Sequence, residues 1–153
     1  MIYNSLHGGF IMENDKKLVT ILVPAYNEQE VLNLLYDRLK KIMDELTKYD
    51  FEILLVNDGS KDNTFKIMQD LRKRDNRICY LNLSRNYGKE TAMIAGLDYS
   101  KGDCVIIIDA DLQDPPELIP KMLEYWEQGY DDVYAKRRSR KGETFMKKFT
   151  SKL

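Results

Sequence analysis

The chain has 153 residues, of which 24 are Lys or Arg and 25 are Asp or Glu, giving a formal net charge of −1. This length suits one domain that is long enough to bury a hydrophobic core. The near-neutral charge argues against a dedicated nucleic-acid binder, in which one sign of charge dominates. No run of about 18 or more apolar residues is present, so the sequence as given predicts no transmembrane helix.

Three segments differ in composition. Residues 1–17 have no hydrophobic periodicity and are expected to form a flexible leader. Residues 18–135 alternate apolar runs with amphipathic patterns, which predicts a single α/β domain. Residues 136–153 carry eight Lys and Arg against one acid and form a basic segment. Cys79 and Cys104 match no metal or redox spacing, so both are expected to be small buried side chains.

Strand and helix patterns alternate along the middle segment. Helical spacing predicts helices that start near residues 27, 60, 90 and 114. Asn27 and Asp114 are expected as N-caps, each in a capping box with a glutamate three residues later. The alternation predicts right-handed crossovers, and therefore a mostly parallel sheet with helices on both faces. Apolar runs rich in β-branched residues predict the strands at 18–23, 51–56, 78–83 and 104–108, with a further one at 132–135.

Polar side chains gather in the loops that follow four of the predicted strands. In open parallel sheets, ligands bind beyond the carboxyl ends of the strands. Since four successive strand ends carry such loops, we expect one binding site there rather than four unrelated solvated loops. The loops are residues 24–28, 57–60, 84–89 and 109–113.

Asp109 and Asp111 directly follow residues 104–108, the most continuous apolar run, which is expected to be a central strand buried on both faces. Two carboxylates at positions i and i+2, where a strand ends, can both reach one ion. Carboxylate oxygens suit Mg²⁺ or Mn²⁺, and Mg²⁺ is usually held by one or two of them together with substrate phosphates. The pair is therefore a candidate metal site, and the alternative is that one aspartate caps the following turn. The only histidine, His7, lies in the leader.

Four strings stand at these loops: VPAYNE from Val23, NDGSKD from Asn57, RNYGK from Arg85 and DADLQDPPE from Asp109. Together they resemble glycosyltransferase family 2, and within it the branch of dolichyl-phosphate mannosyltransferases and bacterial polyprenyl-phosphate glycosyltransferases. The strings follow the family's order and spacing, and the resemblance runs from about Leu18 to the end of the chain. It implies the GT-A fold of nucleotide-diphospho-sugar transferases, which is α/β and Rossmann-like.

The resemblance implies a donor site for a nucleotide diphosphate sugar, with a UDP-sugar as the expected donor. Pro24, Tyr26 and Glu28 would line the base and ribose, and Asp58 would hydrogen-bond the base edge. The family string usually has two acids where this chain has Asn57 and Asp58, so base selectivity is left open. From the residues alone, Tyr26 is alternatively a packed aromatic, and Glu28 a first-turn acid that the helix dipole favours.

The diphosphate end of the donor is implied to lie near Lys89 and the backbone of Gly88. Asp109 and Asp111 would hold the Mg²⁺ or Mn²⁺ ion and count as catalytic residues, and Gln113 would help to orient the site. The alternative for Lys89 is a solvated lysine at the start of a helix.

Residues 136–153 are the expected acceptor segment. The resemblance implies that Arg137 and Arg140 bind the phosphate of a polyprenyl phosphate, with Arg137 among the catalytic residues. Arginine suits this role because its planar fork pairs bidentately with phosphate oxygens. A phosphate monoester is already anionic, so it can attack an anomeric carbon without a strong general base. Phe145 and Phe149 recur between lysines, which suits a helix at an anionic membrane surface or, equally, a helix packed on its own domain.

We therefore expect an inverting, metal-dependent glycosyltransferase that moves a sugar from a UDP-sugar to polyprenyl phosphate at the cytoplasmic side of the membrane, for the cell envelope. One alternative is a soluble transferase with a sugar hydroxyl acceptor, which needs a base beyond these residues. The other is a non-catalytic nucleotide-sugar-binding or membrane-docking module. No nucleic-acid partner is expected. The resembled branch usually continues with more catalytic domain and membrane helices, so we expect this chain to be truncated at its C-terminal end.

Overall fold

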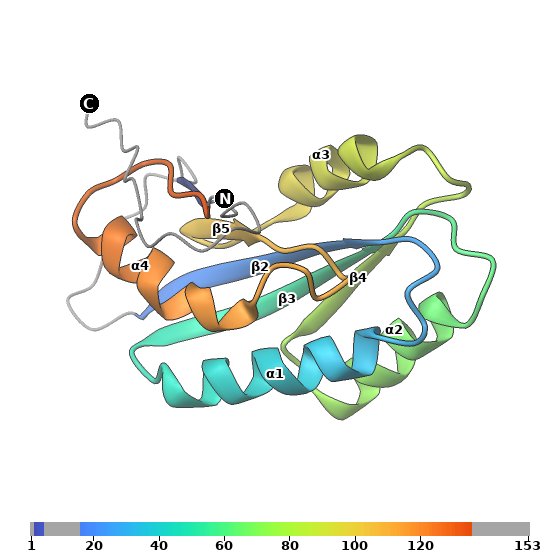
Figure 1. Ribbon diagram of the computed structural model, residues 1–153, viewed down its shortest axis with the longest axis horizontal. Coiled ribbons are helices and arrows are strands. Elements are labelled where there is room, and N and C mark those ends of the chain that lie inside the picture. The colour runs from blue at the N-terminus through green and yellow to red at the C-terminus, as the bar shows by residue number, and fades with distance from the viewer. Residues whose placement is uncertain (1, 5–15, 136–153) are drawn as a thin grey trace, which may run out of the picture.

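The computed structural model describes residues 2–4 and 16–135, which form one mixed sheet with helices on both faces (Figure 1). The strand order is β1-β5-β2-β3-β4. In chain order the elements are β1 (Ile2–Asn4), β2 (Lys17–Ala25), α1 (Leu32–Glu45), β3 (Tyr49–Asn57), α2 (Thr64–Arg74), β4 (Ile78–Asn82), α3 (Lys89–Tyr99), β5 (Cys104–Ile107), the short 3-10 helix η1 (Pro116–Leu118) and α4 (Ile119–Glu127).

Strands β2, β3, β4 and β5 are parallel, as the alternation of strand and helix predicts, and β2 lies in the middle of the sheet. Their carboxyl ends therefore meet along one edge, which is where the four polar loops gather. The predicted strands and α/β class are confirmed, although the strand expected at 132–135 is reduced to a single β-bridge at Val133.

Among the described residues, strand β1 (Ile2–Asn4) was not predicted from the sequence. Residues 2–4 fall in the expected flexible leader, yet they pair antiparallel with β5. The physical reason is that the outer edge of β5 carries backbone N–H and C=O groups that need partners. A strand of three residues is too short to show a period in the sequence. The rest of the expected leader, except Lys16 and Lys17, lies outside the described residues.

The two faces of the sheet bury different amounts of apolar surface. Helices α1, α2 and α4 cover one face over the larger core, and α3 covers the other over a smaller one (Figure 1). Consecutive strand residues point to opposite faces, so Ile21 lies in the larger core and Leu22 in the smaller. Helix α3 packs very close to β2, because a Cβ on Gly96 would lie 2.2 Å from Leu22 Cδ1. This two-sided burial explains the continuous apolar runs of β2 and β5.

Both cysteines have free thiols. Cys104 is fully buried, as expected, and burial raises the pKa of its thiol to about 12. Cys79 is only half-buried.

The predicted capping boxes are wrong. Helix α1 begins at Leu32, and Asn27 instead has a left-handed backbone with φ of +54°. Its side-chain oxygen accepts a hydrogen bond from the Lys61 amide at 2.8 Å, so the residue joins two loops rather than capping a helix. At the other predicted box, the short helix η1 has Pro115 in place of Asp114 as its N-cap, and Glu117 binds the guanidinium of Arg38 through both carboxylate oxygens.

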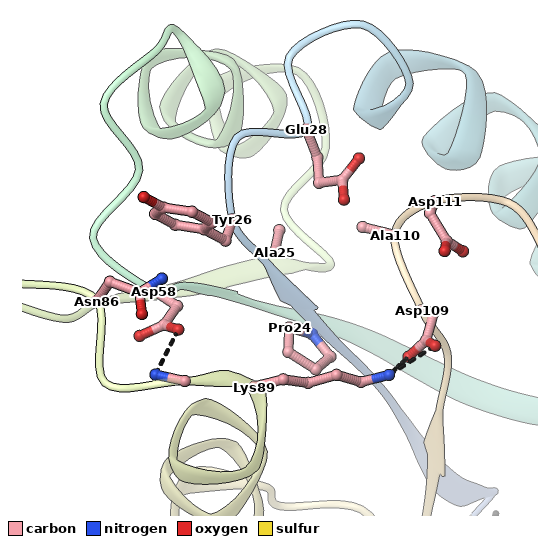
Figure 2. Close-up of a pocket in the computed structure, with 11 residues that line it drawn as sticks. Pro24, Ala25, Tyr26, Glu28, Asp58, Asn86, Lys89, Asp109, Ala110 and Asp111 are labelled. Atoms are coloured by element: carbon pink, nitrogen blue, oxygen red, sulfur yellow. Dashed lines mark hydrogen bonds and ion pairs between the residues drawn. The ribbon is translucent and has the colours of Figure 1, made fainter.

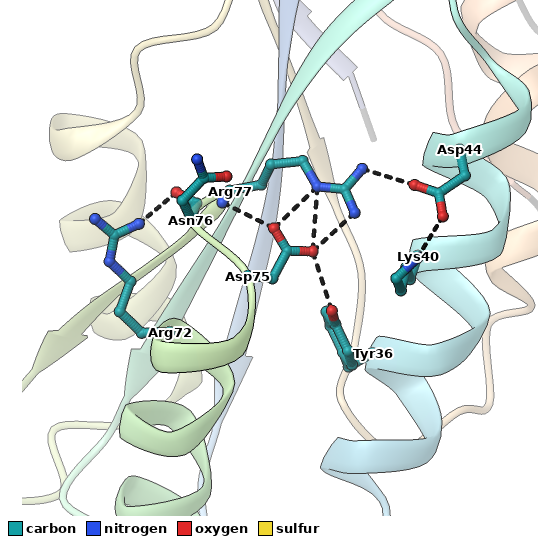
Figure 3. A network of polar contacts seen from close by, with 7 residues as sticks. All are labelled: Tyr36, Lys40, Asp44, Arg72, Asp75, Asn76 and Arg77. Atoms are coloured by element: carbon teal, nitrogen blue, oxygen red, sulfur yellow. Dashed lines mark hydrogen bonds and ion pairs between the residues drawn. The ribbon is translucent and has the colours of Figure 1, made fainter.

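A polar network ties α1 to the turn between α2 and β4 (Figure 3). Because this turn precedes β4, the network lies at the end of the parallel strands opposite the polar loops. Asp75, which is 9% exposed, accepts hydrogen bonds from the Arg77 side chain, the Arg77 amide and the Tyr36 hydroxyl. Arg77 also donates to Asp44 on α1 at 2.9 Å. The guanidinium of Arg77, together with these other donors, lowers the pKa of Asp75 to about 2 although burial opposes the shift.

Candidate functional site

A pocket of about 230 Å³ opens where the carboxyl ends of β2, β3 and β5 meet the start of α3 (Figure 2). One water needs only about 10–15 Å³ by the same measure, so the pocket has room for a ligand. It contains every predicted donor and metal residue except Gln113. Its lining residues are Pro24, Ala25, Tyr26, Glu28, Asp58, Asn86, Gly88, Lys89, Asp109, Ala110 and Asp111.

The loop after β2 forms one wall because it is hydrogen-bonded to the loop after β3. The amide of Asn27 donates to Ser60 Oγ at 3.0 Å, and the amide of Glu28 donates to Thr64 Oγ1 at 2.8 Å. With the backbone held in this way, Tyr26 is 40% exposed at the pocket. The alternative that Tyr26 is a packed core aromatic is therefore wrong.

Glu28 lies before α1 and on the same side of the pocket as Asp109 and Asp111 (Figure 2). Burial, followed by repulsion from Asp111, Asp62 and Asp109, raises the pKa of the Glu28 carboxyl. This side of the pocket therefore has a negative potential that favours the binding of a cation.

Asp58 fixes the loop that precedes α3. Its carboxylate is buried and accepts hydrogen bonds from the amides of Tyr87 at 2.7 Å and Gly88 at 2.9 Å. Gly88 has a φ of +95°, which favours glycine. Both Asp58 oxygens thus have partners within the protein, and the expected contact with a base edge stays a prediction.

Asn57, which replaces an acid of the family string, is also buried but does not line the pocket. Its side chain donates to Asn82 Oδ1 at 2.6 Å and accepts from the Ser60 amide at 3.1 Å. The amide side chain of Asn57 therefore stabilises the loop after β3 from the side that faces away from the pocket. Gly59 is required beside it, because a Cβ there would lie 2.2 Å from the Arg85 carbonyl carbon, and its φ is +66°.

Lys89 pairs with Asp109 across the floor of the pocket (Figure 2). Its ammonium lies 2.5 Å from Asp109 Oδ1 and 2.6 Å from Oδ2. The Lys89 side chain is 60% exposed and that of Asp109 is 26% exposed, so this ion pair faces solvent. Lys89 is therefore part of the site and more than a solvated helix-start residue.

Asp111 both lines the pocket and supports the turn that follows it. Its Oδ1 accepts a hydrogen bond from the Gln113 amide at 3.0 Å, and Leu112 between them has a φ of +60°. The alternative that one aspartate of the pair caps the following turn is therefore correct for Asp111, but it involves only one of the two carboxylate oxygens. Gln113 stays outside the pocket and contributes through its main chain.

The acidic side of the pocket fits a divalent ion that arrives with a phosphate ligand. Within residues 2–4 and 16–135, no group of three or more His, Cys, Asp or Glu is arranged to hold a metal alone. Asp109 and Asp111 would instead fit the one or two carboxylates with which Mg²⁺ is usually bound beside substrate phosphates. Burial and, after it, the neighbouring carboxylates of Asp111, Asp62 and Asp109 raise the pKa of Glu28, and a cation here would offset the charge of those carboxylates.

Three further residues line the pocket, and two predicted ones fall beyond the described part of the chain. Ala25, Asn86 and Ala110 lie in the predicted loops 24–28, 84–89 and 109–113, although none was given a role of its own. Arg137 and Arg140 lie outside the described residues. In the part of the chain that the structure covers, no helix has the length and apolar character to cross a bilayer.

Comparisons with a family model and with individual proteins point to the same family. The model of "Glycosyl transferase family 2" matches residues 20–152. The uncharacterized glycosyltransferase YkcC of Bacillus subtilis is 51% identical over 132 residues, which is 86% of this chain and 41% of that protein. The bactoprenol glucosyl transferase of Shigella phage SfX is 43% identical over 133 residues, or 87% of this chain and 43% of that one. The chain thus spans about two fifths of these relatives' length.

Solved structures show the same fold. TarS 1–349 of S. aureus in complex with UDP matches with a TM-score of 0.52 and 25% identity, covering 69% of this chain and 32% of that chain. The architecture is that of GT-A transferases, as the sequence predicts.

Proposed function

Since the chain belongs to glycosyl transferase family 2, we propose that it forms the donor site of an inverting transferase that moves a sugar from a UDP-sugar to a polyprenyl phosphate. The observation that carries the proposal is a single pocket with an exposed aromatic at one side and two aspartates at the other. Both sides lie at the carboxyl ends of parallel strands, where α/β sheets bind ligands. The UDP complex of TarS supports the choice of nucleotide, and the bactoprenol transferase supports the lipid acceptor.

The donor lies across the pocket in this proposal. Tyr26 and Asn86 stand on the side away from Asp109 and Asp111 (Figure 2). The base and ribose lie along Pro24 and Tyr26, and the ribose reaches Glu28 on the side of Asp109 and Asp111, with Asp58 holding the loop beside the base. An exposed tyrosine ring suits this end because it offers an apolar face and a polar tip.

The diphosphate lies towards the opposite side, near the Lys89 ammonium at Asp109. The Gly88 amide, which the sequence placed near the diphosphate, is instead bound to Asp58. Asp109 and Asp111 would hold Mg²⁺ or Mn²⁺, whose bound charge offsets the charge that develops on a departing diphosphate. Lys89 adds a further positive charge, and Gln113 keeps Asp111 oriented through its amide.

The acceptor binds, in this proposal, to the basic segment of residues 136–153. Arg137 and Arg140 orient a lipid phosphate, whose oxygen attacks the anomeric carbon from the face opposite the diphosphate. The bond from that carbon to the diphosphate oxygen then breaks, and the sugar inverts. Because the attacking phosphate is already an anion, the reaction needs no strong base. The lysines of residues 136–153 favour an anionic membrane surface at the cytoplasmic side, where such a lipid lies.

A sugar hydroxyl is the second candidate acceptor, and the raised pKa of the Glu28 carboxyl favours it. A neutral hydroxyl needs a base, and a carboxyl with a raised pKa beside the metal ligands is suited to take its proton. Transfer by the full-length protein to polyprenyl phosphate, but not to free sugars, would exclude this candidate.

Donor binding is tested by thermal unfolding of the chain with UDP-, GDP- and CDP-sugars, each with and without Mn²⁺. A ligand at about a hundredfold excess over its Kd stabilises the fold by about 2.7 kcal/mol. We expect the largest rise in Tm with a UDP-sugar and Mn²⁺ together, and its loss in Asp111→Asn. Asp70→Asn, on the exposed face of α2, is the matched control and should respond as the wild type does. An equal response in Asp111→Asn would contradict the metal assignment.

A further inference from the structure

The ion pair between Lys89 and Asp109 occupies the oxygens that a metal ion would need. The ammonium sits between both carboxylate oxygens, at 2.5 and 2.6 Å. A divalent ion bound to those oxygens would stand in nearly the same place, and its charge would repel the lysine. The ammonium and the metal are therefore alternative partners of Asp109.

Lys89 is also the one basic side chain among the described residues that line the pocket, which has Glu28, Asp58, Asp109 and Asp111 on its walls. Of these acids, Asp58 is satisfied by two backbone amides. Among residues 2–4 and 16–135, a diphosphate that enters the pocket would thus find one lining ammonium, and that ammonium is held by Asp109.

The lysine can change partners without a change of backbone. Asp58 holds the Tyr87 and Gly88 amides, and Thr91 Oγ1 donates to the Tyr87 carbonyl oxygen at 3.2 Å, so the start of α3 is fixed. The Lys89 side chain, by contrast, is 60% exposed on a flexible four-carbon stem. Exposed ion pairs of this kind are weak and easily exchanged.

We propose that Lys89 is an internal cation that holds Asp109 until a nucleotide diphosphate arrives, and that its move to the diphosphate opens Asp109 to the metal ion. Lys89 is thus a positioning residue that makes nucleotide and metal bind cooperatively. The inference rests on the proposed donor site, and it adds the order in which the two ligands bind there: the nucleotide diphosphate first and the metal ion second. By linkage, the factor by which UDP tightens Mn²⁺ binding equals the factor by which Mn²⁺ tightens UDP binding.

The test measures Mn²⁺ affinity from the electron paramagnetic resonance of the free ion, with and without UDP, in the wild type and in Lys89→Met. Without UDP, Lys89→Met should bind Mn²⁺ about two- to fivefold more tightly, which is the range that the loss of an exposed ion pair allows. With UDP the gain should vanish, so the coupling factor between UDP and Mn²⁺ should fall. Lys89→Arg keeps the charge and should retain most of the coupling.

The matched control is Lys121→Met on α4, because Lys121 also forms a short exposed ion pair, 2.6 Å from Glu124. It should leave both Mn²⁺ affinities unchanged. Unchanged or weaker Mn²⁺ binding by Lys89→Met without UDP, with an intact coupling factor, would overturn the role of Lys89 while leaving the donor site in place. A wild type that binds no Mn²⁺ even with UDP would overturn the metal assignment and this inference together.

Discussion

Two aspartates of this fold face a cation at opposite ends of the parallel strands, and they differ in how firmly they are held. Asp75 receives hydrogen bonds from the Arg77 side chain, the Arg77 amide and the Tyr36 hydroxyl, and its side chain is 8% exposed (Figure 3). Asp109 pairs with the ammonium of Lys89, whose side chain is 60% exposed (Figure 2).

The difference follows from the chemistry of the two cations. The guanidinium of Arg77 is a planar fork that fixes Asp75 and reaches Asp44 at the same time. The ammonium of Lys89 is a point charge on a flexible stem, and it places no directional demand on its partner. The first pair ties α1 to the turn between α2 and β4, whereas the second leaves its aspartate available to another cation.

The largest effect we expect is on stability, from Arg77→Met. The substitution leaves Asp75 buried without its guanidinium, so the free energy of unfolding should fall by about 2–3 kcal/mol, the value of hydrogen bonds to a charged group. Lys89→Met is the matched comparison and should change stability by less than about 0.5 kcal/mol, because exposed pairs contribute little. Urea unfolding of both variants measures the contrast, and equal losses would contradict it.

A second expectation concerns pH. The pKa of Asp75 is lowered to about 2 in the folded state from its ordinary value of 3.8, so the unfolded state binds more protons between these values. Stability from this group is therefore present above about pH 4 and is lost as the pH falls through 2. The shift corresponds to about 2 kcal/mol.

The measurement compares wild type with Asp75→Asn by urea unfolding from pH 6 to about pH 2. The wild type should be more stable at pH 6, and its advantage should shrink towards the acid end. A difference in stability that stays constant across this range would show that the Asp75 carboxylate is not the titrating group.

The fold was largely predictable because hydrophobic periods report strands and helices directly. Both faces of β2 and β5 are covered, and the continuous apolar runs indicated this. The capping boxes failed for a reason that sequence spacing cannot show. Asn27 contacts Lys61 and Ser60, which lie more than thirty residues further along the chain. A partner of this kind comes from the fold, and it outweighed the local preference for a helix start.

The candidate site was predictable in its residues but much less in their contacts. The rule that ligands bind at the carboxyl ends of parallel strands, together with the family strings, located Tyr26, Asp58, Lys89 and Asp109. Neither source showed that Lys89 pairs with Asp109 or that Asp58 holds two loop amides. The Asp58 contacts join the loops after β3 and β4, which approach closely at Gly59, and the Lys89–Asp109 pair joins α3 to the loop after β5. Both kinds of contact come from the fold and leave no mark in the local sequence.

The smallest expected effect concerns Asp58, a firmly held carboxylate that lies in the same pocket as the exchangeable pair. In Asp58→Asn, one oxygen becomes an NH₂ group that faces a backbone N–H, so one of the two amide hydrogen bonds is lost. We expect a stability loss of about 1–2 kcal/mol, since a buried donor is left without its acceptor.

The more telling result for Asp58→Asn is local. Hydrogen exchange of the Tyr87 and Gly88 amides should speed up, because Asp58 is their acceptor. The affinity for UDP should also fall, because the loop that positions Lys89 is then less firmly held. Asn57→Asp is the informative control, as it restores the family's acid at a buried position that does not line the pocket. If Asp58→Asn weakened UDP binding while both amides exchanged at the wild-type rate, Asp58 would contact the nucleotide itself, and the loop would owe its shape to Gly59 and Gly88 alone.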